Sequence, residues 1–500
     1  MQAIERRLPD ERATIRLGED IAAALRRGDV IALQGDLGAG KTTLARGLIR
    51  ALANEAELDV PSPTFTLVQS YETRVPLFHF DLYRLSSPDE LDELGLDEAV
   101  ATGAALIEWP EKAGDRLPAD SATLTLTDDG DGRLARIEGP EEFLARVERS
   151  LAIRDFLADC GWGDAVRTHL TGDASARSYE TVALPGSPPR ILMNSPRLVL
   201  GPPVRDGKPY AEIAHTAQSV HAFVGVAKLL REAGISVPQV FACDLDRGFL
   251  LIEHLGSGNF LSPDGAPISQ RYEAAARLLA FMHERQWPDR AEVAPGRIHR
   301  VPPFDREAML IEVELVLDWY IPSLKGGPAT AGERTAFLDA WNKVLDRLDR
   351  AETTLMLRDV QSPNFIWRPE REGLDRLGVI DFQDALIGPA AYDVASLALD
   401  PRVTIPPEIE RAIVEAYVAA RISPDFDRAA FEEAYAIMGA QRHSKILGLF
   451  VRLDRRDGKP IYLKHLPRVR NYLRRTFAHP ALREVRDVYL EAGILDGTPE

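Results

Sequence analysis

The first 150 residues alternate between helix-like periodicity and short apolar runs. Residues 20–27 have helical spacing and end at Gly28, and the apolar run 30–33 follows at once. Two further apolar runs, 77–81 and 105–108, end in acids, as buried parallel strands with polar carboxyl ends do. Residues 123–137 alternate apolar and polar side chains around a turn rich in Asp and Gly, which predicts an edge hairpin. The pattern predicts an α/β domain over residues 1–148.

The pattern changes after residue 148. A helix is expected over residues 150–159, followed by a stretch rich in Gly and Pro up to Pro209. The apolar run 249–253 predicts a strand and residues 254–256 a hinge, and helical periodicity dominates from Gln270 onward. We therefore predict a second, bilobal α+β domain over residues 150–500. Its lobes are a β-rich N-lobe at 150–255 and a larger helical C-lobe at 256–500.

Composition is that of a globular protein in a reducing compartment. The chain has 500 residues, of which 45% are hydrophobic and 27% charged, and its two cysteines, Cys160 and Cys243, lie far apart. The N-terminal segment lacks the apolar core of a signal peptide, and no run of about eighteen apolar residues occurs. These features predict a cytoplasmic protein without a membrane-spanning segment.

Acidic residues are concentrated in the first domain. The formal net charge of the chain is −17, and residues 1–150 contribute −12 of it, from 17 basic and 29 acidic side chains. An acidic surface repels a phosphate backbone, whose binding depends on Lys and Arg. Direct tight binding of RNA or DNA is therefore not expected.

Residues 35–42, with the sequence GDLGAGKT, have the spacing of a phosphate-binding loop between a strand and a helix predicted over 43–52. The glycines allow backbone N–H groups to converge on phosphate oxygens, while Lys41 reaches the β- and γ-phosphates and Thr42 binds Mg²⁺. The alternative, a chance glycine turn before a helix, is disfavoured by the matching strand and helix. The predicted ATP-binding residues of this loop are Gly35, Gly38, Ala39, Gly40, Lys41, Thr42 and Thr43.

Two carboxylates at predicted strand ends are candidates for the metal site. Asp81 is expected to hold Mg²⁺ directly or through water, and Glu108 is a similar candidate. An Asp at a strand end is, taken alone, more often a turn or cap residue. Trp109 either stacks on a base or fills the core.

Four motifs in this part occur in a characteristic order: GDLGAGKTTLARG at 35–47, PSPTFTLVQSY at 61–71, HFDLYRL at 79–85 and IEWPE at 107–111. Together they resemble the TsaE family, the ATPase subunit of the bacterial tRNA threonylcarbamoyladenosine synthesis machinery, over nearly all of residues 1–145. The resemblance implies a P-loop NTPase fold in which Lys41 and Thr42 bind phosphates and magnesium, and Asp81 and Glu108 complete the metal and hydrolysis site. It also implies partner subunits, TsaB-like and TsaD-like, that carry the modification chemistry and handle the RNA.

A second constellation lies in the C-terminal part. Residues 357–364, LRDVQSPN, have the Asp-x4-Asn spacing of a phosphotransferase catalytic loop, and an apolar strand ending in Asp381 follows. In such a site Asp359 accepts the hydroxyl proton, and Asn364 and Asp381 hold Mg²⁺. Leu357 replaces the usual His, and Met193 stands where a strand Lys would pair with the nucleotide, so a pseudokinase is an alternative.

Six strings in this part resemble the AmgK family, anomeric kinases for N-acetylmuramate and N-acetylglucosamine in the aminoglycoside-phosphotransferase group, over about residues 150–480. Met193 matches that family, whereas Leu357 and Asn194 depart from it. The resemblance implies Asp359 as base, a hinge that contacts ATP through Glu253 and Leu255, and a phosphate-covering loop with Gly172, Asp173, Ala174, Ser175 and Arg177. The strings are LTGDASARSYE, RILMNSP, LLIEHLG, LRDVQSPNFIW, VIDFQDALIGPAAYDVASL and GAQRHSKILGLFVRL.

Sugar selectivity is predicted from a basic cluster. Arg442, His443 and Lys445 fall on one predicted helix, with Arg442 and Lys445 on the same face, and are candidates to meet the lactyl carboxylate of N-acetylmuramate. A solvated helix face is the alternative.

The sequence thus predicts a bifunctional fusion in which both halves use ATP and Mg²⁺: an ATPase subunit of tRNA modification and a kinase for a small amino sugar. Three alternatives stay open. The second half is a kinase for another hydroxyl substrate, such as choline, a homoserine-like acceptor or an aminoglycoside. It is instead a non-catalytic scaffold. Or the whole chain is a nucleotide-gated assembly protein that uses slow hydrolysis as a timer.

Overall fold

The computed structural model describes residues 3–170 and 177–496, and the chain divides into two compact units. Of the described residues, the first unit comprises 3–170 and 178–193, and the second comprises 177 and 194–496. Helix α5 runs without interruption through the predicted domain boundary at residues 148–150. The elements up to the end of the first unit are β1 (Ile4–Leu8), α1 (Glu11–Ala24), β2 (Val30–Gln34), α2 (Lys41–Ala53), β3 (Val68–Tyr71), β4 (Leu77–Asp81), α3 (Glu90–Glu93), α4 (Leu96–Thr102), β5 (Ala104–Glu108), β6 (Ala122–Asp129), β7 (Gly132–Glu138), α5 (Glu141–Asp159), β8 (Val166–Leu170), β9 (Ser178–Ala183) and β10 (Arg190–Asn194).

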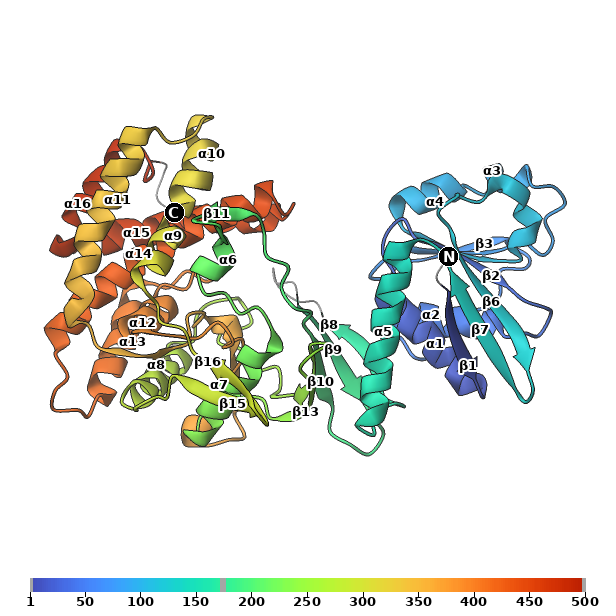
Figure 1. Cartoon of the computed structure of the whole chain (residues 1–500), viewed down its shortest axis with the longest axis horizontal. Helices are drawn as coiled ribbons and strands as arrows, with labels where there is room; N and C mark the ends of the chain where they lie inside the picture. The colour runs from blue at the N-terminus through green and yellow to red at the C-terminus, as the bar shows by residue number, and fades with distance from the viewer. Residues whose placement is uncertain (1–2, 171–176, 497–500) are drawn as a thin grey trace. The chain divides into compact units, whose positions relative to one another are not determined.

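A seven-stranded sheet forms the centre of the first unit, in the order β1-β7-β6-β2-β5-β4-β3. Strand β2 pairs in parallel with β5 and β6, and β4 pairs in parallel with β5. Alternate side chains of β5 enter different cores: Leu106 joins the core under α1, α2 and α5, while Ile107 joins the core under α3 and α4. Helices therefore cover both faces of this sheet (Figure 1), and the predicted α/β fold with parallel strands is confirmed.

Three local predictions for this unit were wrong. The helix predicted over residues 150–159 is the second half of α5, which begins at Glu141. Helix α1 begins at Glu11 rather than at residue 20, because the side chain of Asp10 accepts a hydrogen bond from the Ala13 N–H and caps the helix. The hairpin β6–β7 does not lie at the sheet edge. Strand β6 pairs with β2, and β1 pairs with β7 in an antiparallel register that places Ile4 opposite Ile137.

The second unit is mostly helical, with short strand pairs. Its elements are β11 (Pro203–Arg205), β12 (Lys208–Pro209), α6 (Tyr210–Ile213), α7 (Val220–Glu232), β13 (Val240–Asp244), β14 (Phe249–Glu253), α8 (Ser269–His283), β15 (Arg290–Ala294), β16 (Arg297–Arg300), α9 (Arg306–Val313), α10 (Ile321–Lys325), α11 (Ala331–Leu345), β17 (Thr353–Met356), β18 (Phe365–Trp367), β19 (Leu377–Val379), β20 (Leu386–Pro389), α12 (Ala391–Ala398), α13 (Pro407–Ala420), α14 (Arg428–Arg455), α15 (Leu466–Thr476) and α16 (Arg483–Glu491). The predicted strand 249–253 and the helical character after residue 270 are confirmed.

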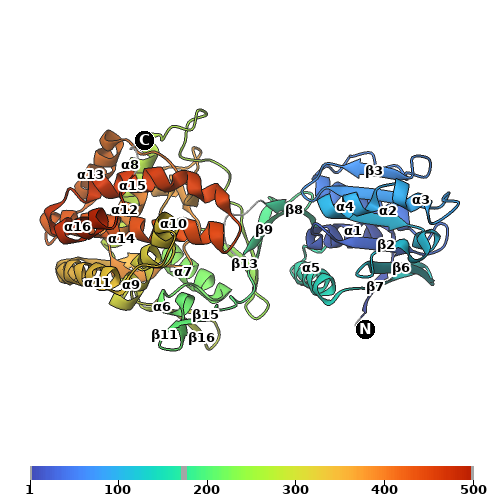
Figure 2. The same ribbon diagram turned by 90° about the horizontal axis from the view of Figure 1, so that it is seen from above.

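Two antiparallel strand pairs, β17–β20 and β18–β19, frame residues 357–364 and 380–385. Helix α14 lies beside α12 and α15 (Figure 2) and buries nine consecutive residues, from Ala436 to Ser444. A helix that is buried all round packs into a core rather than onto a surface. Part of α14 therefore belongs to the interior of the second unit.

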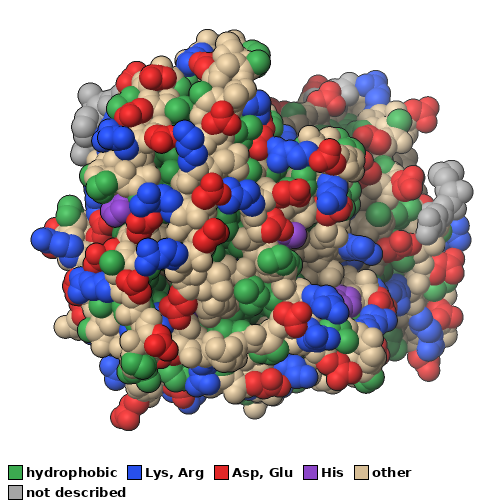
Figure 3. Space-filling view, turned by 60° about the vertical axis from the view of Figure 1, so that its left-hand side comes forward, with side chains coloured by type: hydrophobic (Ala, Val, Ile, Leu, Met, Phe, Trp, Pro, Cys, Tyr) green, Lys and Arg blue, Asp and Glu red, His purple; other side chains and the backbone are tan. Residues whose placement is uncertain are grey.

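Two surface properties bear on function. On the face of the molecule in Figure 3, Lys and Arg side chains are intermixed with Asp and Glu side chains. Among residues 3–170 and 177–496, no helix combines the length and the apolar character needed to cross a membrane.

Candidate active sites

The loop between β2 and α2 has the geometry of an anion cradle. Gly35, Gly38 and Gly40 have φ values of 144°, 82° and 102°, in the region that favours glycine. A side chain at Gly35 would also collide with the backbone, because its Cβ would lie 2.7 Å from the carbonyl oxygen of Leu126. Helix α2 begins at Lys41, and its first N–H groups face the loop with the positive end of the helix dipole.

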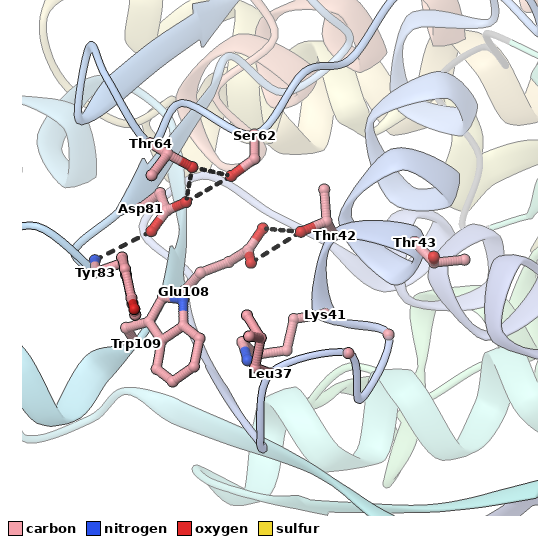
Figure 4. A pocket seen from close by; sticks show the side chains of 12 residues that line it. Leu37, Lys41, Thr42, Thr43, Ser62, Thr64, Asp81, Tyr83, Glu108 and Trp109 are labelled. Atoms are coloured by element: carbon pink, nitrogen blue, oxygen red, sulfur yellow. Dashed lines mark hydrogen bonds between the residues drawn. The ribbon is translucent and has the colours of Figure 1, made fainter.

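This loop lines a pocket of about 440 Å³, which Figure 4 shows from close by. The pocket brings together eight of the candidates that the sequence predicted, from the loop and from two strand ends, and adds four other residues. Its lining residues are Leu37, Gly38, Gly40, Lys41, Thr42, Thr43, Ser62, Thr64, Asp81, Tyr83, Glu108 and Trp109.

Asp81 lies at the end of β4 and accepts three hydrogen bonds. Ser62 Oγ and Thr64 Oγ1 donate to its Oδ2 at 2.5 and 2.7 Å, and the backbone N–H of Tyr83 donates to its Oδ1 at 3.1 Å (Figure 4). Ser62 was not predicted as a site residue, although it lies in the PSPTF motif. These bonds fix the carboxylate in the orientation that faces the pocket.

Glu108 lies at the end of β5, opposite Asp81 in the parallel register. Thr42 Oγ1 lies 3.2 and 3.1 Å from its two carboxylate oxygens, and His79 Nε2 lies 3.0 Å from its Oε1. His79 is completely buried. It was not predicted either, but the apolar spacing of HFD places its side chain on the same face of β4 as Asp81.

The ammonium group of Lys41 is held by carbonyl oxygens of its own loop. Its Nζ donates to the carbonyl oxygens of Gly35 and Asp36 at 2.6 and 3.0 Å, and lies 3.7 Å from the centre of the Trp109 ring. Burial lowers the pKa of Lys41, and the nearby carboxylates, Glu108 first, act in the opposite direction. An arriving phosphate would replace weak carbonyl acceptors with a charged one. The hydroxyl and carboxylate oxygens of Thr42, Asp81 and Glu108 are the hard donors that fit Mg²⁺.

The second constellation lies on the loops framed by β17–β20 and β18–β19. Asn364 Nδ2 donates to the Asp359 carbonyl oxygen at 2.7 Å and lies 3.4 Å from Asp381 Oδ2, so the three predicted residues do converge. Loss of hydration raises the pKa of Asp381 to about 6, and the Asp359 carboxylate adds to this rise. The amide and carboxylate oxygens of Asn364 and Asp381 fit Mg²⁺.

Both loops contain strained backbone. Arg358 and Asp381 have φ values of 70° and 60°, which residues other than glycine rarely adopt. Asp393, completely buried on α12, accepts the backbone N–H groups of Leu357 and Arg358 at 2.6 and 2.9 Å. The loop at residues 357–364 is therefore held from its backbone, and Leu357, which is buried, contributes apolar packing there.

Arg177 reaches this site from before β9. Its Nη1 lies 3.2 Å from Asp381 Oδ1, and its Nη2 lies 3.3 Å from Asp384 Oδ2. Gln383 Nε2 also donates to Asp381, at 2.8 Å. Neither Gln383 nor Asp384 was singled out in the sequence, although both follow Asp381 directly. The other predicted members of the phosphate-covering loop, Gly172, Asp173, Ala174 and Ser175, lie outside the described residues.

Three further residues singled out for the nucleotide site, Glu253, Leu255 and Met193, lie on or beside strands of the β-rich part. Glu253 ends β14 and accepts the backbone N–H of Gln239 at 3.1 Å. Leu255 is buried, and its Cδ1 lies where a side chain on Gly378 would be. Met193 is buried in β10, as an apolar replacement of a cation would be.

The predicted sugar-binding cluster on α14 has other partners. His443 is completely buried, with its ring nitrogens 2.8 Å from the carbonyl oxygens of Gly439 and Leu399, and burial lowers its pKa to about 4. Lys445 Nζ lies 2.7 Å from Glu312 Oε1, and Arg442 Nη1 donates to the carbonyl oxygen of Arg358. The shared helix face of Arg442 and Lys445 did not mean that their side chains were exposed, because this part of α14 is packed in the interior of the second unit.

Two family models match the chain. The model described as "Threonylcarbamoyl adenosine biosynthesis protein TsaE" matches residues 8–136, and the model described as "Phosphotransferase enzyme family" matches residues 116–433.

Curated relatives match the two parts separately. The chain is 34% identical over 350 residues to an N-acetylmuramate/N-acetylglucosamine kinase of Caulobacter vibrioides, covering 68% of this chain and 95% of the relative. A kinase of the same description from Pseudomonas aeruginosa is 33% identical over 351 residues, covering 67% of this chain and 91% of the relative. A tRNA threonylcarbamoyladenosine biosynthesis protein TsaE of Rickettsia bellii is 41% identical over 133 residues, covering 26% of this chain and 91% of the relative.

Proposed function

Because the chain belongs to the TsaE family through its N-terminal part and to the phosphotransferase enzyme family through the rest, we propose that it is a bifunctional ATP-dependent enzyme. Residues 1–148 hydrolyse ATP in support of tRNA threonylcarbamoylation. Residues 150–500 transfer the γ-phosphoryl group of ATP to the anomeric hydroxyl of N-acetylmuramate or N-acetylglucosamine. The observation that carries the proposal is the presence of two separate sets of phosphate-site residues, around Lys41 and around Asp359.

In the first site the chain's own residues bind and orient the nucleotide. The glycine loop and the start of α2 hold the phosphates, and Lys41 exchanges its carbonyl acceptors for phosphate oxygens. Thr42, Asp81 and Glu108 would hold Mg²⁺, which neutralises phosphate charge when bound. Glu108, anchored by His79, is positioned to orient a water molecule. The partners of this half are the other subunits of the tRNA-modifying machinery, which agrees with its acidic charge.

In the second site Asp359 accepts the proton of the anomeric hydroxyl. The sugar oxygen forms a bond to the γ-phosphorus while the bond from that phosphorus to the bridging oxygen breaks, and ADP leaves. Asn364 and Asp381 would hold Mg²⁺, and Arg177 faces the same carboxylate. Asp393 supports this mechanism by fixing the backbone around Asp359.

The decisive experiment uses the full chain with Lys41→Ala, which silences the first site. This variant is incubated with Mg-ATP and either sugar, and sugar-1-phosphate is detected by phosphorus NMR. We expect product, and we expect it to vanish when Asp359→Asn is added. No product from folded protein with either sugar would overturn the kinase assignment and favour another hydroxyl acceptor or a scaffold.

The ATPase assignment has its own test. In the Asp359→Asn chain, Mg-ATP hydrolysis is expected to persist and to disappear on adding Lys41→Ala. Retained turnover in the double variant would overturn it. Stimulation by the tRNA-modifying partners without any sugar dependence would favour the timer role for the whole chain.

A further inference from the structure

Arg442 contacts the strained segment that carries the proposed catalytic base. Its Nη1 donates to the carbonyl oxygen of Arg358 at 2.7 Å, next to the peptide that Asp393 holds from its N–H groups. The same nitrogen lies 3.4 Å from Asp359 Oδ1, and Nη2 lies 3.5 Å from that oxygen. One guanidinium therefore contacts both the backbone and the carboxylate of the catalytic loop.

Arg442 is itself fixed in the interior. Only 3% of the residue is exposed, its Nη1 lies 3.2 Å from the Tyr392 hydroxyl, and its guanidinium lies 5.5 Å from the centre of the Tyr392 ring. By contrast, 32% of the Asp359 side chain is exposed. Arg442 thus lies deeper in the protein than Asp359. A sugar that approaches from solvent would meet the Asp359 carboxylate before it could reach Arg442.

A buried ionic cluster supports this arrangement. Glu312, which is completely buried on α9, is ion-paired with Arg358 and with Lys445 Nζ at 2.7 Å. Gln441 Nε2 donates to Glu312 Oε2 at 3.0 Å. The cluster places the cations of Arg358, Arg442 and Lys445 beneath the loop, and the Glu312 carboxylate pairs with two of them, Arg358 and Lys445.

We infer that Arg442 is a positioning residue for the proposed phosphoryl transfer, and not a ligand of the substrate's carboxylate. It orients the Asp359 carboxylate toward the acceptor hydroxyl, from a helix 83 residues further along the chain. This inference rests on the proposed kinase function and on the assignment of Asp359 as its base.

The two sugars separate the roles, because N-acetylmuramate carries a lactyl carboxylate and N-acetylglucosamine does not. In the Lys41→Ala chain, Arg442→Met is expected to lower kcat for both sugars by the same factor, about 100-fold, with KM for each nearly unchanged. Arg442→Lys keeps the charge and is expected to recover part of the loss. Arg455→Gln, an exposed position on the same helix, is the matched control and should leave both activities unchanged.

A second comparison, with the double variant, separates an effect of Arg442 through Asp359 from a general effect on folding. If Arg442 acts through Asp359, Arg442→Met adds little further loss to the Asp359→Asn chain, since residues that act as a unit are not additive. A loss confined to N-acetylmuramate and expressed in KM would make Arg442 a substrate ligand and overturn the inference. Unchanged kcat for both sugars would overturn it as well.

Failure of the proposed function gives a different result. If the Lys41→Ala chain phosphorylates neither sugar, the acceptor assignment fails, and Arg442 is then tested on the slow transfer of phosphate from ATP to water at the same site. That hydrolysis is expected to fall in Arg442→Met and to be partly recovered in Arg442→Lys. Equal hydrolysis in all three chains, or none that depends on Asp359, would overturn the inference.

Discussion

Arg167 donates a hydrogen bond from Nη1 to Oδ1 of Asp20 at 2.7 Å, and so ties strand β8 to helix α1. The same guanidinium binds Glu180 of β9 through two nitrogens, at 2.6 and 2.8 Å. All three residues are buried, with exposed fractions of 6, 2 and 7%. The first strands after the TsaE-like segment are therefore anchored to a helix of that segment by a buried ion cluster.

Removing this arginine should destabilise the first unit. Arg167→Met leaves two buried carboxylates without their shared cation, and the expected loss is about 3–5 kcal/mol of opening free energy. Hydrogen exchange of β8 and α1 amides in the full chain measures it. Arg16→Gln, which removes an ion pair to the exposed Asp164, is the control and should cost less than about 1 kcal/mol. Equal effects of the two variants would contradict this prediction.

Local sequence was sufficient to predict which residues come together around the phosphate loop. A phosphate loop needs its glycines, Lys41 and Thr42 within one short segment, and strand ends that carry Asp81 and Glu108 meet because parallel strands share an edge. The hydrophobic pattern was too weak to predict a strand where charged residues occupy most of its positions. Strand β1 has the sequence IERRL, and its two apolar ends are too few to predict that it would cover the hairpin β6–β7.

Partners distant in sequence could not be predicted in the same way. Arg442 and Lys445 have the spacing of one helix face, which is as consistent with a solvated surface as with a site. Their partners, Arg358 and Glu312, lie on other elements more than 80 residues away. Only the packing of α14 inside the second unit reveals that Arg442 contacts the loop at residues 357–364 and that Lys445 pairs with the buried Glu312.

His79 is expected to influence ATP hydrolysis without contacting the nucleotide. It is completely buried, and its Nε2 lies 3.0 Å from Glu108 Oε1. In the Asp359→Asn chain, His79→Leu should lower kcat for ATP hydrolysis about 10-fold and leave KM for ATP nearly unchanged, because it frees the Glu108 side chain.

His79→Gln is the matched variant, since its amide N–H replaces the imidazole donor. It should retain more activity than His79→Leu. Steady-state kinetics of both variants measure the difference, and identical losses in the two would remove the hydrogen bond to Glu108 as the cause.

Stability of the second unit should depend on pH through His443. Burial lowers its pKa to about 4, below the ordinary value near 6.5, so the unfolded chain binds a proton at a higher pH than the folded chain does. The stability that the neutral ring contributes is complete above pH 6.5 and is lost as the pH falls from 6.5 to 4. The loss reaches about 1.4 kcal/mol for each pH unit in this window.

His443→Gln removes the titrating group and should flatten this dependence. The free energy of unfolding is measured for both chains between pH 7 and pH 5. His299, whose pKa burial also lowers to about 4, keeps its own contribution in both chains and cancels in the comparison. An unchanged slope in His443→Gln would contradict the prediction.

Arg177 is expected to serve the kinase site through two carboxylates. Its guanidinium spans Asp381 Oδ1 and Asp384 Oδ2 at 3.2 and 3.3 Å, near the predicted metal ligands. In the Lys41→Ala chain, Arg177→Met should lower kcat/KM for ATP by about 10- to 100-fold, because the site loses its closest cation to Asp381 among the described residues. Arg177→Lys should be intermediate, since an ammonium group is a point charge that does not match both carboxylates.

Arg421 offers a control with the same chemistry at a different place. It also joins two carboxylates, Glu284 and Glu352, each at 2.7 Å, but none of its described partners belongs to the kinase site. Arg421→Met should lower the melting temperature while leaving kcat/KM for ATP unchanged at temperatures where the protein is folded. If both methionine variants lost activity only in proportion to their loss of stability, Arg177 would be a structural residue, and the nucleotide would draw its positive charge from elsewhere.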